Sequence, residues 1–313
     1  MSCVPLEKQV TYRGSFTKDF PLGEKSWFRC GGSADLLFEP EDIEDLSIFL
    51  KEYPKDEPLM VLGGMANCII RDGGIRGCVI RLGKPFAEIE IHGNKIMAGA
   101  GALNGSVAAA AAKAGIGGLE FLSGIPGTVG GALAMNAGAY GREVKDILSA
   151  GMALDAYGGF VPLDLEDMDM SYRKCGAAAS GDLVFVSAIF EGVEEDKTLV
   201  RERLKEIKAK RQDTQPISEK TGGSTFANPT DEELEAAGLE KGTRAWQLVE
   251  KVGGRGLKIG GAQMSEKHCN FMINTGDASA SDLEDLGDEL IRRVREECGV
   301  ELHWEIKRLG ERG

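Results

Sequence analysis

The strongest candidate for chemistry is a glycine-rich segment near the middle of the chain. Residues 123–141 read SGIPGTVGGALAMNAGAYG, with glycines around a short run of small, helix-compatible residues. Backbone N–H groups left open by glycine at a helix start can bind an anion, so the pattern favours a pyrophosphate ligand. Dense glycine is also compatible with tight packing of small residues alone, and that alternative stays open.

A second glycine loop follows a predicted strand at 58–64. It reads VLGGMANCIIRDGG over residues 61–74. Two loops from separate segments can hold one dinucleotide from both sides. Neither a G-x-G-x-x-G after a strand with an acidic residue some 20 positions on nor a G-x-x-x-x-G-K-[ST] motif occurs, so a Rossmann NAD domain and a P-loop are not expected.

The composition limits the remaining function classes. Glycine accounts for 43 of 313 residues, about twice the usual share of roughly 7%, and its clusters interrupt otherwise well-patterned sequence. The net charge of −13 opposes attraction to nucleic acid or an anionic membrane. Three histidines and seven cysteines without a C-x-x-C pair predict no metal site and no disulfide framework. Without a long apolar run or a signal peptide, we expect a cytoplasmic protein.

The hydrophobic pattern predicts mixed helices and strands in the first two thirds of the chain. Helices are expected at 41–53 and 105–115, with Asn104 as the N-cap of the second. The polar, charged pattern at 196–212 predicts a surface helix and a domain boundary near 195. The expected strands lie at 58–64, 77–83 and 182–190, with hairpins over 88–101, turning at Gly93-Asn94, and over 149–164, turning at Gly158-Gly159.

The last third is predicted to be α+β. A strand is expected at 268–276, and a helix begins at Ser281, where Ser281 and Glu284 form a capping box, and ends at Gly299. Residues 301–309 alternate, which places Leu302, Trp304 and Ile306 on one face of a strand and Glu305 on the other.

Further blocks, in chain order, carry a resemblance to one family. They are WFRCGG (27–32), SYRK (171–174), GGSTFANP (222–229), KIGGAQMSEKHCNFMIN (258–274) and ELHWEIKRLG (301–310). Together with the two glycine loops, they resemble the UDP-N-acetylenolpyruvoylglucosamine reductase (MurB) family over essentially the whole length.

The resemblance implies an α+β, vanillyl-alcohol-oxidase-like FAD-binding fold of two subdomains plus a C-terminal α+β substrate domain. On this sequence the first FAD-binding subdomain would span 1–85, with the last strand, 300–313, returning to it. The second would span 86–195 and the substrate domain 196–299. The short stretch between Tyr172 and Leu183 resembles the subtype called type II, which has a trimmed substrate domain.

The implied activity is the NADPH-dependent, FAD-mediated reduction of UDP-N-acetylglucosamine enolpyruvate to UDP-N-acetylmuramate in peptidoglycan biosynthesis. In the family, NADPH reduces the flavin and leaves, and the enolpyruvyl sugar then enters the same cleft. The implied partners are these two small molecules, with no nucleic acid, membrane or obligate protein partner.

Three catalytic residues carry over from the motifs. Arg173 would stabilise the enolate that forms on hydride addition, and Ser224 would deliver a proton to its α-carbon. Glu305 would hydrogen-bond the enolate as an acid, which at neutral pH requires a raised pKa. Judged without the family, Arg173 and Glu305 read as solvent-facing residues and Ser224 as a turn residue.

The binding residues carry over in the same way. FAD would contact the two glycine loops through Gly63, Gly64, Asn67, Gly124, Ile125, Pro126, Gly127, Thr128, Gly130 and Gly131. Substrate would contact Tyr172, Asn228 and Lys267, with Arg29, Arg211 and Gln215 as further candidates for the uridine diphosphate.

Two positions depart from the family pattern. Met65-Ala66 stands where Gly-Ser is usual, which removes a hydroxyl and places a Cβ where a tight backbone would require positive φ. Ala227 stands where Lys is common, which removes one cationic contact. The sequence therefore leaves two rivals open, an FAD oxidase of the same fold, with Cys30 and Cys68 near the loops, and a flavin-binding protein with a decayed site.

Overall fold

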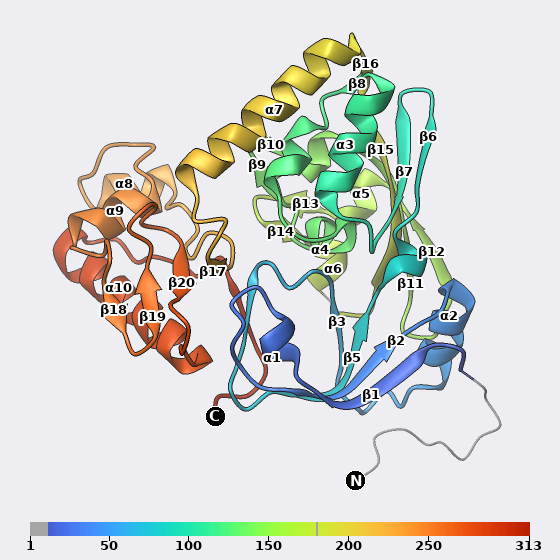
Figure 1. The fold of residues 1–313 in the computed structure, drawn as a ribbon, viewed down its shortest axis with the longest axis horizontal. Helices are drawn as coiled ribbons and strands as arrows, with labels where there is room; N and C mark the ends of the chain where they lie inside the picture. The colour runs from blue at the N-terminus through green and yellow to red at the C-terminus, as the bar shows by residue number, and fades with distance from the viewer. Residues whose placement is uncertain (1–11, 180) are drawn as a thin grey trace. The chain divides into compact units, whose positions relative to one another are not determined.

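The computed structural model describes residues 12–179 and 181–313, and the fold is shown in Figure 1. The described chain divides into two compact units. The first unit comprises the residues up to Phe20, Asp35–Gly64 and Gly77–Lys210, and the second comprises Pro21–Ala34, Met65–Arg76 and Arg211–Gly313. The expected three-part division at 85 and 195 stays a prediction.

The first unit contains a four-stranded sheet in the order β1-β2-β5-β3. Its core forms where the helix α2 (Ile43–Glu52) turns Leu46, Phe49 and Leu50 towards Phe38 of β2. The predicted helix at 41–53 is thus confirmed, and Asp42 caps it by accepting from the N–H of Asp45. The strands are β1 (Ser15–Phe20), β2 (Ala34–Glu39), β3 (Leu59–Leu62) and β5 (Ile75–Arg81).

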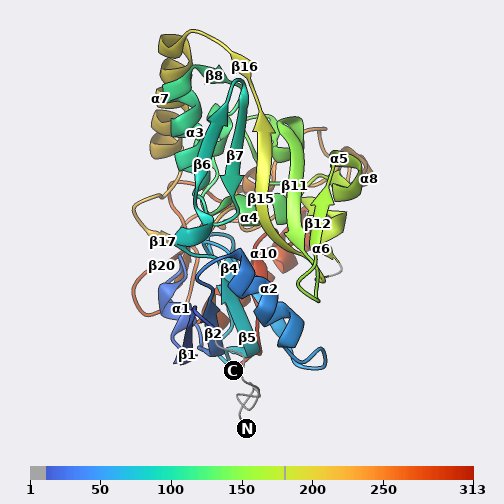
Figure 2. The same cartoon turned by 90° about the vertical axis from the view of Figure 1, so that its right-hand side faces the viewer.

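A five-stranded antiparallel sheet completes the first unit, in the order β12-β11-β15-β7-β6 (Figure 2). Both predicted hairpins are confirmed, and Gly93 (φ +62°) and Gly158 (φ +78°) occupy the left-handed region at their turns. The strands are β6 (Ile89–His92), β7 (Lys95–Gly99), β11 (Leu148–Leu154), β12 (Phe160–Leu163) and β15 (Val184–Glu191).

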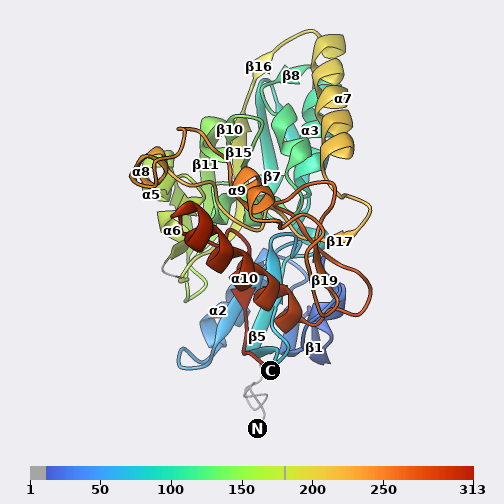
Figure 3. The same cartoon turned by 90° about the vertical axis from the view of Figure 1, so that its left-hand side faces the viewer.

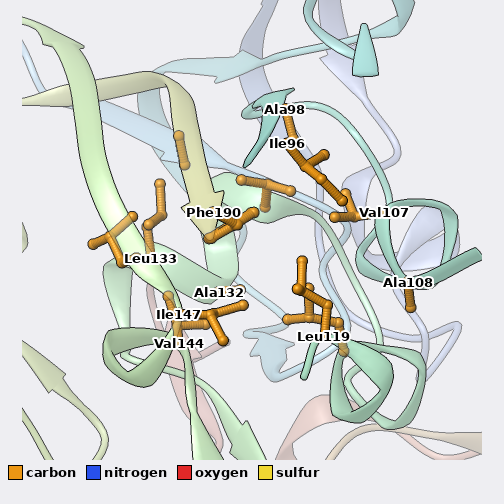
Figure 4. Close-up of a cluster of buried hydrophobic side chains, with 14 of the residues drawn as sticks. Ile96, Ala98, Val107, Ala108, Leu119, Ala132, Leu133, Val144, Ile147 and Phe190 are labelled. Atoms are coloured by element: carbon orange, nitrogen blue, oxygen red, sulfur yellow. The ribbon is translucent and has the colours of Figure 1, made fainter. Parts of the chain in front are cut away.

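Two helices cover one face of this sheet and close its core. Ile96 and Phe190 from the strands pack with Val107 of α3 (Asn104–Ala114) and Leu133 of α4 (Val129–Ala134), as Figure 4 shows. The expected N-cap of α3 is wrong. Leu103 holds the cap position, and Asn104 is the first helical residue because its buried side chain donates to the carbonyl of Thr128 (3.4 Å).

Short elements connect these sheets, and the predicted polar helix at 196–212 is present as α7. The remaining elements of this part of the chain are β8 (Ile116–Gly117), β9 (Gly138–Ala139), β10 (Arg142–Glu143), α5 (Leu165–Met168), β13 (Met170–Ser171), β14 (Lys174–Cys175), α6 (Gly176–Ala179), β16 (Val193–Glu194), α7 (Lys197–Thr214) and three 3₁₀ turns, Lys84–Phe86, Glu120–Gly124 and Val144–Asp146.

The second unit contains a small sheet in the order β17-β20-β19-β18, and the helix α10 packs on it. Figure 3 shows α10 together with α8 and α9. The final strand β21 (Lys307–Leu309) lies outside that sheet and pairs in parallel with β4 (Cys68–Ile70). The other elements are α1 (Leu22–Lys25), β17 (Lys220–Thr221), α8 (Asp231–Ala236), α9 (Ala245–Lys251), β18 (Lys258–Ile259), β19 (Ala262–Met264), β20 (Met272–Asn274) and α10 (Ala280–Cys298).

The predicted helix near 281 exists, but its capping box lies two residues earlier than expected. Ser279 caps α10 and pairs with Asp282. Ser281 is already inside the helix, and the carboxylate of Asp72 accepts from its N–H and its hydroxyl. Gly299 ends the helix with φ +71°, as predicted.

The predicted strand at 301–309 is regular only at its end, but its alternation is correct. Leu302 and Ile306 are buried, whereas His303 and Lys307 are exposed. Trp304 packs on α10 at Gly287, where an added Cβ would lie 2.1 Å from the indole ring. The strand expected at 268–276 is likewise shortened to β20, because residues 265–271 form a closed loop.

Within the described residues, no helix is long and apolar enough to cross a membrane. The same residues contain no group of three or more His, Cys, Asp or Glu side chains arranged to hold a metal ion.

We predict that Gly287→Ala destabilises the second unit. The new methyl group would overlap the Trp304 ring, and such overpacking lowers the free energy of unfolding by about 1–3 kcal/mol. The three tryptophans, Trp27, Trp246 and Trp304, all belong to the second unit, so urea unfolding followed by tryptophan fluorescence measures this change. Glu297→Ala, at an exposed position on the same helix, is the control and should change stability by less than about 0.5 kcal/mol. Equal stability of the two variants would contradict the packing argument.

Candidate active site

The two predicted glycine loops touch each other in the first unit. A Cβ at Gly63 would lie 2.4 Å from Thr128 Oγ1, and a Cβ at Gly64 would lie 2.9 Å from Gly127 Cα. Gly127 also has φ +94°, a conformation that side chains disfavour. Glycine is therefore required at positions 63 and 64 because the two loops approach each other closely.

Main-chain hydrogen bonds fix the second loop on the end of β7. Val129 N–H donates to the carbonyl of Ala102 (2.9 Å), and Gly130 N–H donates to that of Ala100 (2.8 Å). Asn104 N–H in turn donates to the carbonyl of Gly127 (3.1 Å). The loop is thus held rigidly before any ligand arrives.

The Thr128 hydroxyl is a candidate ligand contact in the first unit. It is buried and has no hydrogen-bond partner among the described residues. A buried polar group without a partner costs free energy, so such a group calls for an explanation. A ligand oxygen above the glycine loops would supply the partner.

A cavity of about 280 Å³ adjoins these loops in the first unit. Its walls are mainly apolar, from Leu62, Leu82 and Phe185, and Gly63, Thr128 and Gly130 form its loop side. Its size suits one part of a dinucleotide. The helix after the loop, α4, has only six residues, so loop N–H groups and the Thr128 hydroxyl would do more for an anion than the helix dipole.

Arg173 lies in the first unit, in the turn between β13 and β14. Its backbone has φ +56°, which is uncommon for a residue other than glycine. The guanidinium donates to the carbonyl of Gly138 (3.1 Å) and stacks on the ring of Tyr172, with its carbon 4.9 Å from the ring centroid. Asn136 steadies the turn by donating to the carbonyl of Ser171 (2.9 Å). The cation is therefore oriented by contacts on more than one side.

Ser224 and Glu305 lie on neighbouring segments of the second unit. Glu305 N–H donates to the carbonyl of Thr225 (2.9 Å), and Ala227 N–H donates to the carbonyl of His303 (2.9 Å). Phe226 and Trp304 face each other in the antiparallel bridge between these bonds. Two residues 81 positions apart in the sequence are thus placed on paired backbones, and both are partly buried.

Asn67, expected to contact FAD, sits beside both of these segments in the second unit. Its side-chain amide donates to the carbonyl of Glu305 (3.2 Å), and Lys307 N–H donates to its backbone carbonyl (3.1 Å). A Cβ at Gly223 would lie 2.7 Å from Asn67 Oδ1. The loop after Gly64 therefore supports the backbone that carries Glu305.

The departure at Met65 has the expected conformational consequence. Met65 has φ +50°, in the left-handed region, and its side chain is buried. An L residue with a Cβ is strained in that region, typically by about 1 kcal/mol or more. The expectation that this departure from the family pattern places a Cβ at a position of positive φ is therefore confirmed for Met65.

The predicted substrate residues are dispersed over both units. Tyr172, in the first unit, is exposed. In the second unit, Asn228 accepts from the N–H of Ala245 (3.2 Å) at the start of α9, and the Lys267 ammonium donates to the carbonyl of Gln212. Arg211 donates to the side chain of Gln215 (3.1 Å), and Arg29 donates to the carbonyl of Glu24 (3.1 Å). None of these contacts assigns a ligand, so their roles stay predictions.

Sequence reasoning did not single out Asn270. It is buried and hydrogen-bonds the backbone next to Ser224. Its only sequence signal is a polar residue within an otherwise apolar stretch, CNFM, which is too weak to identify it.

The two cysteines considered for covalent flavin attachment are poor nucleophiles. Burial raises the pKa of Cys30 to about 12, with a smaller contribution from the carboxylates of Asp72 and Asp282. Burial likewise raises the pKa of Cys68 to about 12. The thiolate, which is the reactive form, is therefore scarce at neutral pH for both residues.

Comparison with known proteins agrees with this description. A family model described as the FAD binding domain matches residues 34–165, and one described as the C-terminal domain of UDP-N-acetylenolpyruvoylglucosamine reductase matches residues 215–309. The enzymes of that name from Parvibaculum lavamentivorans and Phenylobacterium zucineum are each 49% identical to this chain. The alignments cover 98% and 95% of this chain and 95% and 96% of those relatives.

A solved structure extends the likeness to the fold. The UDP-N-acetylenolpyruvylglucosamine reductase (MurB) from Thermus caldophilus superposes with a TM-score of 0.77 at 31% identity, over 96% of this chain and all of that one. The expected α+β fold of the vanillyl-alcohol-oxidase type is thereby confirmed.

We predict that any flavin purified with this protein is not covalently bound, because Cys30 and Cys68 are buried, protonated thiols. Precipitation with acid should release all of the flavin absorbance into the supernatant. A yellow pellet would show that flavin is bound covalently. Loss of that colour in the Cys30→Ser variant or in the Cys68→Ser variant would contradict this prediction.

Proposed function

Because the chain belongs to the UDP-N-acetylenolpyruvoylglucosamine reductase family of FAD-binding oxidoreductases, we propose that it uses NADPH to reduce UDP-N-acetylglucosamine enolpyruvate. The product would be UDP-N-acetylmuramate, for peptidoglycan synthesis. The observation that carries the proposal is the pairing of the Ser224 and Glu305 segments by main-chain hydrogen bonds in the second unit. Two acids on fixed, adjacent backbones suit the protonation of a reduced double bond.

The glycine loops fit FAD. When bound, FAD carries a hydride from NADPH to the substrate. The pyrophosphate would lie against Gly63, Gly64, Gly127, Gly130 and Gly131, and the Thr128 hydroxyl would donate to it. Asn67, Gly124, Ile125 and Pro126 would complete the contacts of the two loops.

Arg173 would stabilise charge on the substrate. Hydride addition at the β-carbon of the enolpyruvyl group moves an electron pair towards the carboxylate and gives an enolate-like state. A guanidinium held by Gly138 and Tyr172 can interact with that charge without reorganising, and such preorganised groups contribute most to lowering the barrier.

Ser224 would donate the proton to the α-carbon, which completes the addition of two hydrogens. A hydroxyl is a weak acid, so the site must stabilise or reprotonate the alkoxide that remains. Glu305, on the paired segment, would hydrogen-bond the substrate carboxylate in its protonated form. Tyr172, Asn228 and Lys267 would contact the rest of the sugar nucleotide.

The proposed activity is tested directly by its products. NADPH oxidation should require the enolpyruvyl sugar and proceed without oxygen. Mass spectrometry should show a product heavier than the substrate by two hydrogens, with one deuterium from NADPH labelled at its transferable position. NADPH oxidation that depends only on oxygen would support the alternative that the protein is an FAD oxidase. Absence of bound flavin would support the alternative of a binding protein whose site has decayed.

We predict opposite effects of Thr128→Val on the free protein and on FAD binding. In the flavin-free protein, the change removes a buried hydroxyl without a partner and should raise the free energy of unfolding by about 1 kcal/mol. In the complex it removes a hydrogen bond to a charged group, so the FAD dissociation constant should rise about 10- to 100-fold. Thermal unfolding and FAD titration measure the two effects. Thr128→Ser is the control and should retain affinity, and tight FAD binding by Thr128→Val would remove Thr128 from the site.

We predict that Ser224→Ala separates the two half-reactions. Bleaching of the flavin by NADPH should stay within about twofold of the unmodified protein, while recovery with the enolpyruvyl sugar should slow by about 10²- to 10⁴-fold, the usual contribution of a general acid. Anaerobic stopped-flow absorbance measures both rates. Ser218→Ala, at an exposed serine of the same unit, should change neither. Equal slowing of both half-reactions by Ser224→Ala would exclude the proton-donor role.

A further inference from the structure

The segment that carries Ser224 has little regular structure of its own. It follows the two-residue strand β17 and precedes α8, and its one ladder contact within the described part of the chain is the isolated bridge between Phe226 and Trp304. The neighbouring Thr225 side chain does not hold it, because its hydroxyl is buried without a partner among the described residues. The path of the backbone at Ser224 therefore depends on a small number of hydrogen bonds.

Asn270 supplies three of these bonds. Its side-chain oxygen accepts from the N–H of Phe226 (2.9 Å), and its side-chain amide donates to the carbonyl of Phe226 (2.8 Å). Its backbone carbonyl accepts from the N–H of Thr225 (2.8 Å). The carboxamide thus bonds Phe226 as the peptide group of an adjacent strand would.

The position of Asn270 is itself fixed by the loop around it. Ser265 N–H donates to the carbonyl of Phe271 (2.8 Å), and Phe271 N–H donates to that of His268 (3.1 Å). The Ser265 hydroxyl accepts from the N–H of Lys267 (3.1 Å), and Asn270 N–H donates to His268 Nδ1 (3.2 Å). Asn270 is 5% exposed, so its bonds form in a low-dielectric environment where they strengthen and where water cannot replace them.

The Ser224 segment therefore lies between two partners. On one side Thr225 accepts from Glu305 N–H, and on the other side it and Phe226 bond Asn270. From this geometry we propose that Asn270 is a positioning residue, which holds the Ser224 hydroxyl at the distance from the substrate that proton transfer requires. This inference rests on the proposed function. Because displacements of about 1 Å can slow an enzyme about 10²-fold, a residue that only holds the backbone can control the rate.

Neither Asp nor Ala at position 270 can make both side-chain hydrogen bonds to Phe226. Asp has the same shape and retains the acceptor, but it cannot donate to the carbonyl of Phe226 and would place two acceptors face to face. Ala retains only the bond of the backbone carbonyl. Both variants should loosen the Ser224 segment while leaving the glycine loops of the first unit unchanged.

Asn274 is a matched control. It is 3% exposed and lies in the same unit, and its side chain makes three hydrogen bonds to backbone groups, one more than the side chain of Asn270. Those side-chain bonds go to Phe28, Gly276 and Ala278, and none of them goes to residues 223–227. If Asn270 had only a structural role, Asn270→Ala and Asn274→Ala would have equal effects on the rate of flavin recovery and on the melting temperature.

The test is anaerobic stopped-flow absorbance on the flavin-loaded protein, with NADPH and then UDP-N-acetylglucosamine enolpyruvate. For Asn270→Asp and Asn270→Ala we expect bleaching within about twofold of normal and recovery slowed about 30- to 100-fold. For Asn274→Ala we expect both rates near normal, with the melting temperature lowered to a similar degree. If Asn270→Ala does not fold, the isosteric Asn270→Asp decides alone.

A double-mutant cycle connects the effect to Ser224. Once Ser224 is replaced by Ala, adding Asn270→Asp should slow recovery by less than about threefold, because residues that act as one unit are not additive. Multiplication of the two single effects, normal recovery in both Asn270 variants, or equal slowing in Asn274→Ala would overturn the proposal. If the unmodified protein itself fails to recover with the sugar, the reductase function fails and the role of Asn270 falls with it.

Discussion

The first unit depends on the close approach of two loops, which leaves no space for a side chain at Gly63 or Gly64. Gly63 and Gly64 meet Gly127 and Thr128 at distances that a Cβ at either glycine would violate. The hydrogen bonds from Val129 and Gly130 to the end of β7 keep this contact in place. The high glycine content of the chain is thereby explained in part as a steric requirement, and the buried Thr128 hydroxyl turns the same contact into a binding surface.

The second unit solves a different problem, which is to fix reactive side chains on irregular backbone. Ser224 and Glu305 come from segments with almost no regular strand, yet each is held by main-chain bonds to the other segment. Asn67 and Asn270 brace the pair through side-chain amides. Amides suit this task because one carboxamide can donate and accept at once, as a peptide group does. The positions of Ser224 and Glu305 are thus fixed by the residues around them. The packing of Trp304 on Gly287 supports the backbone that carries Glu305.

The predictable parts of the molecule were those set by local pattern. Hairpins with glycine at their turns, the amphipathic helix α2 and the alternation at 301–306 could be predicted because period and turn chemistry act over a few residues. The caps of α3 and α10 were placed wrongly, and both expected cap residues bond groups distant in the sequence, Asn104 the Thr128 carbonyl and Ser281 the Asp72 carboxylate, which no local pattern reveals. Arg173, Ser224 and Glu305 could be selected only through family resemblance. Asn270 escaped detection because its role arises from a contact 44 residues away along the chain.

The most direct measurement is to follow flavin absorbance of the purified protein without oxygen, first after NADPH and then after UDP-N-acetylglucosamine enolpyruvate. A reductase of the proposed kind bleaches rapidly with NADPH and stays bleached until the sugar restores its absorbance. A protein that carries no flavin, or that bleaches and recovers only when oxygen is admitted, would contradict the proposed function.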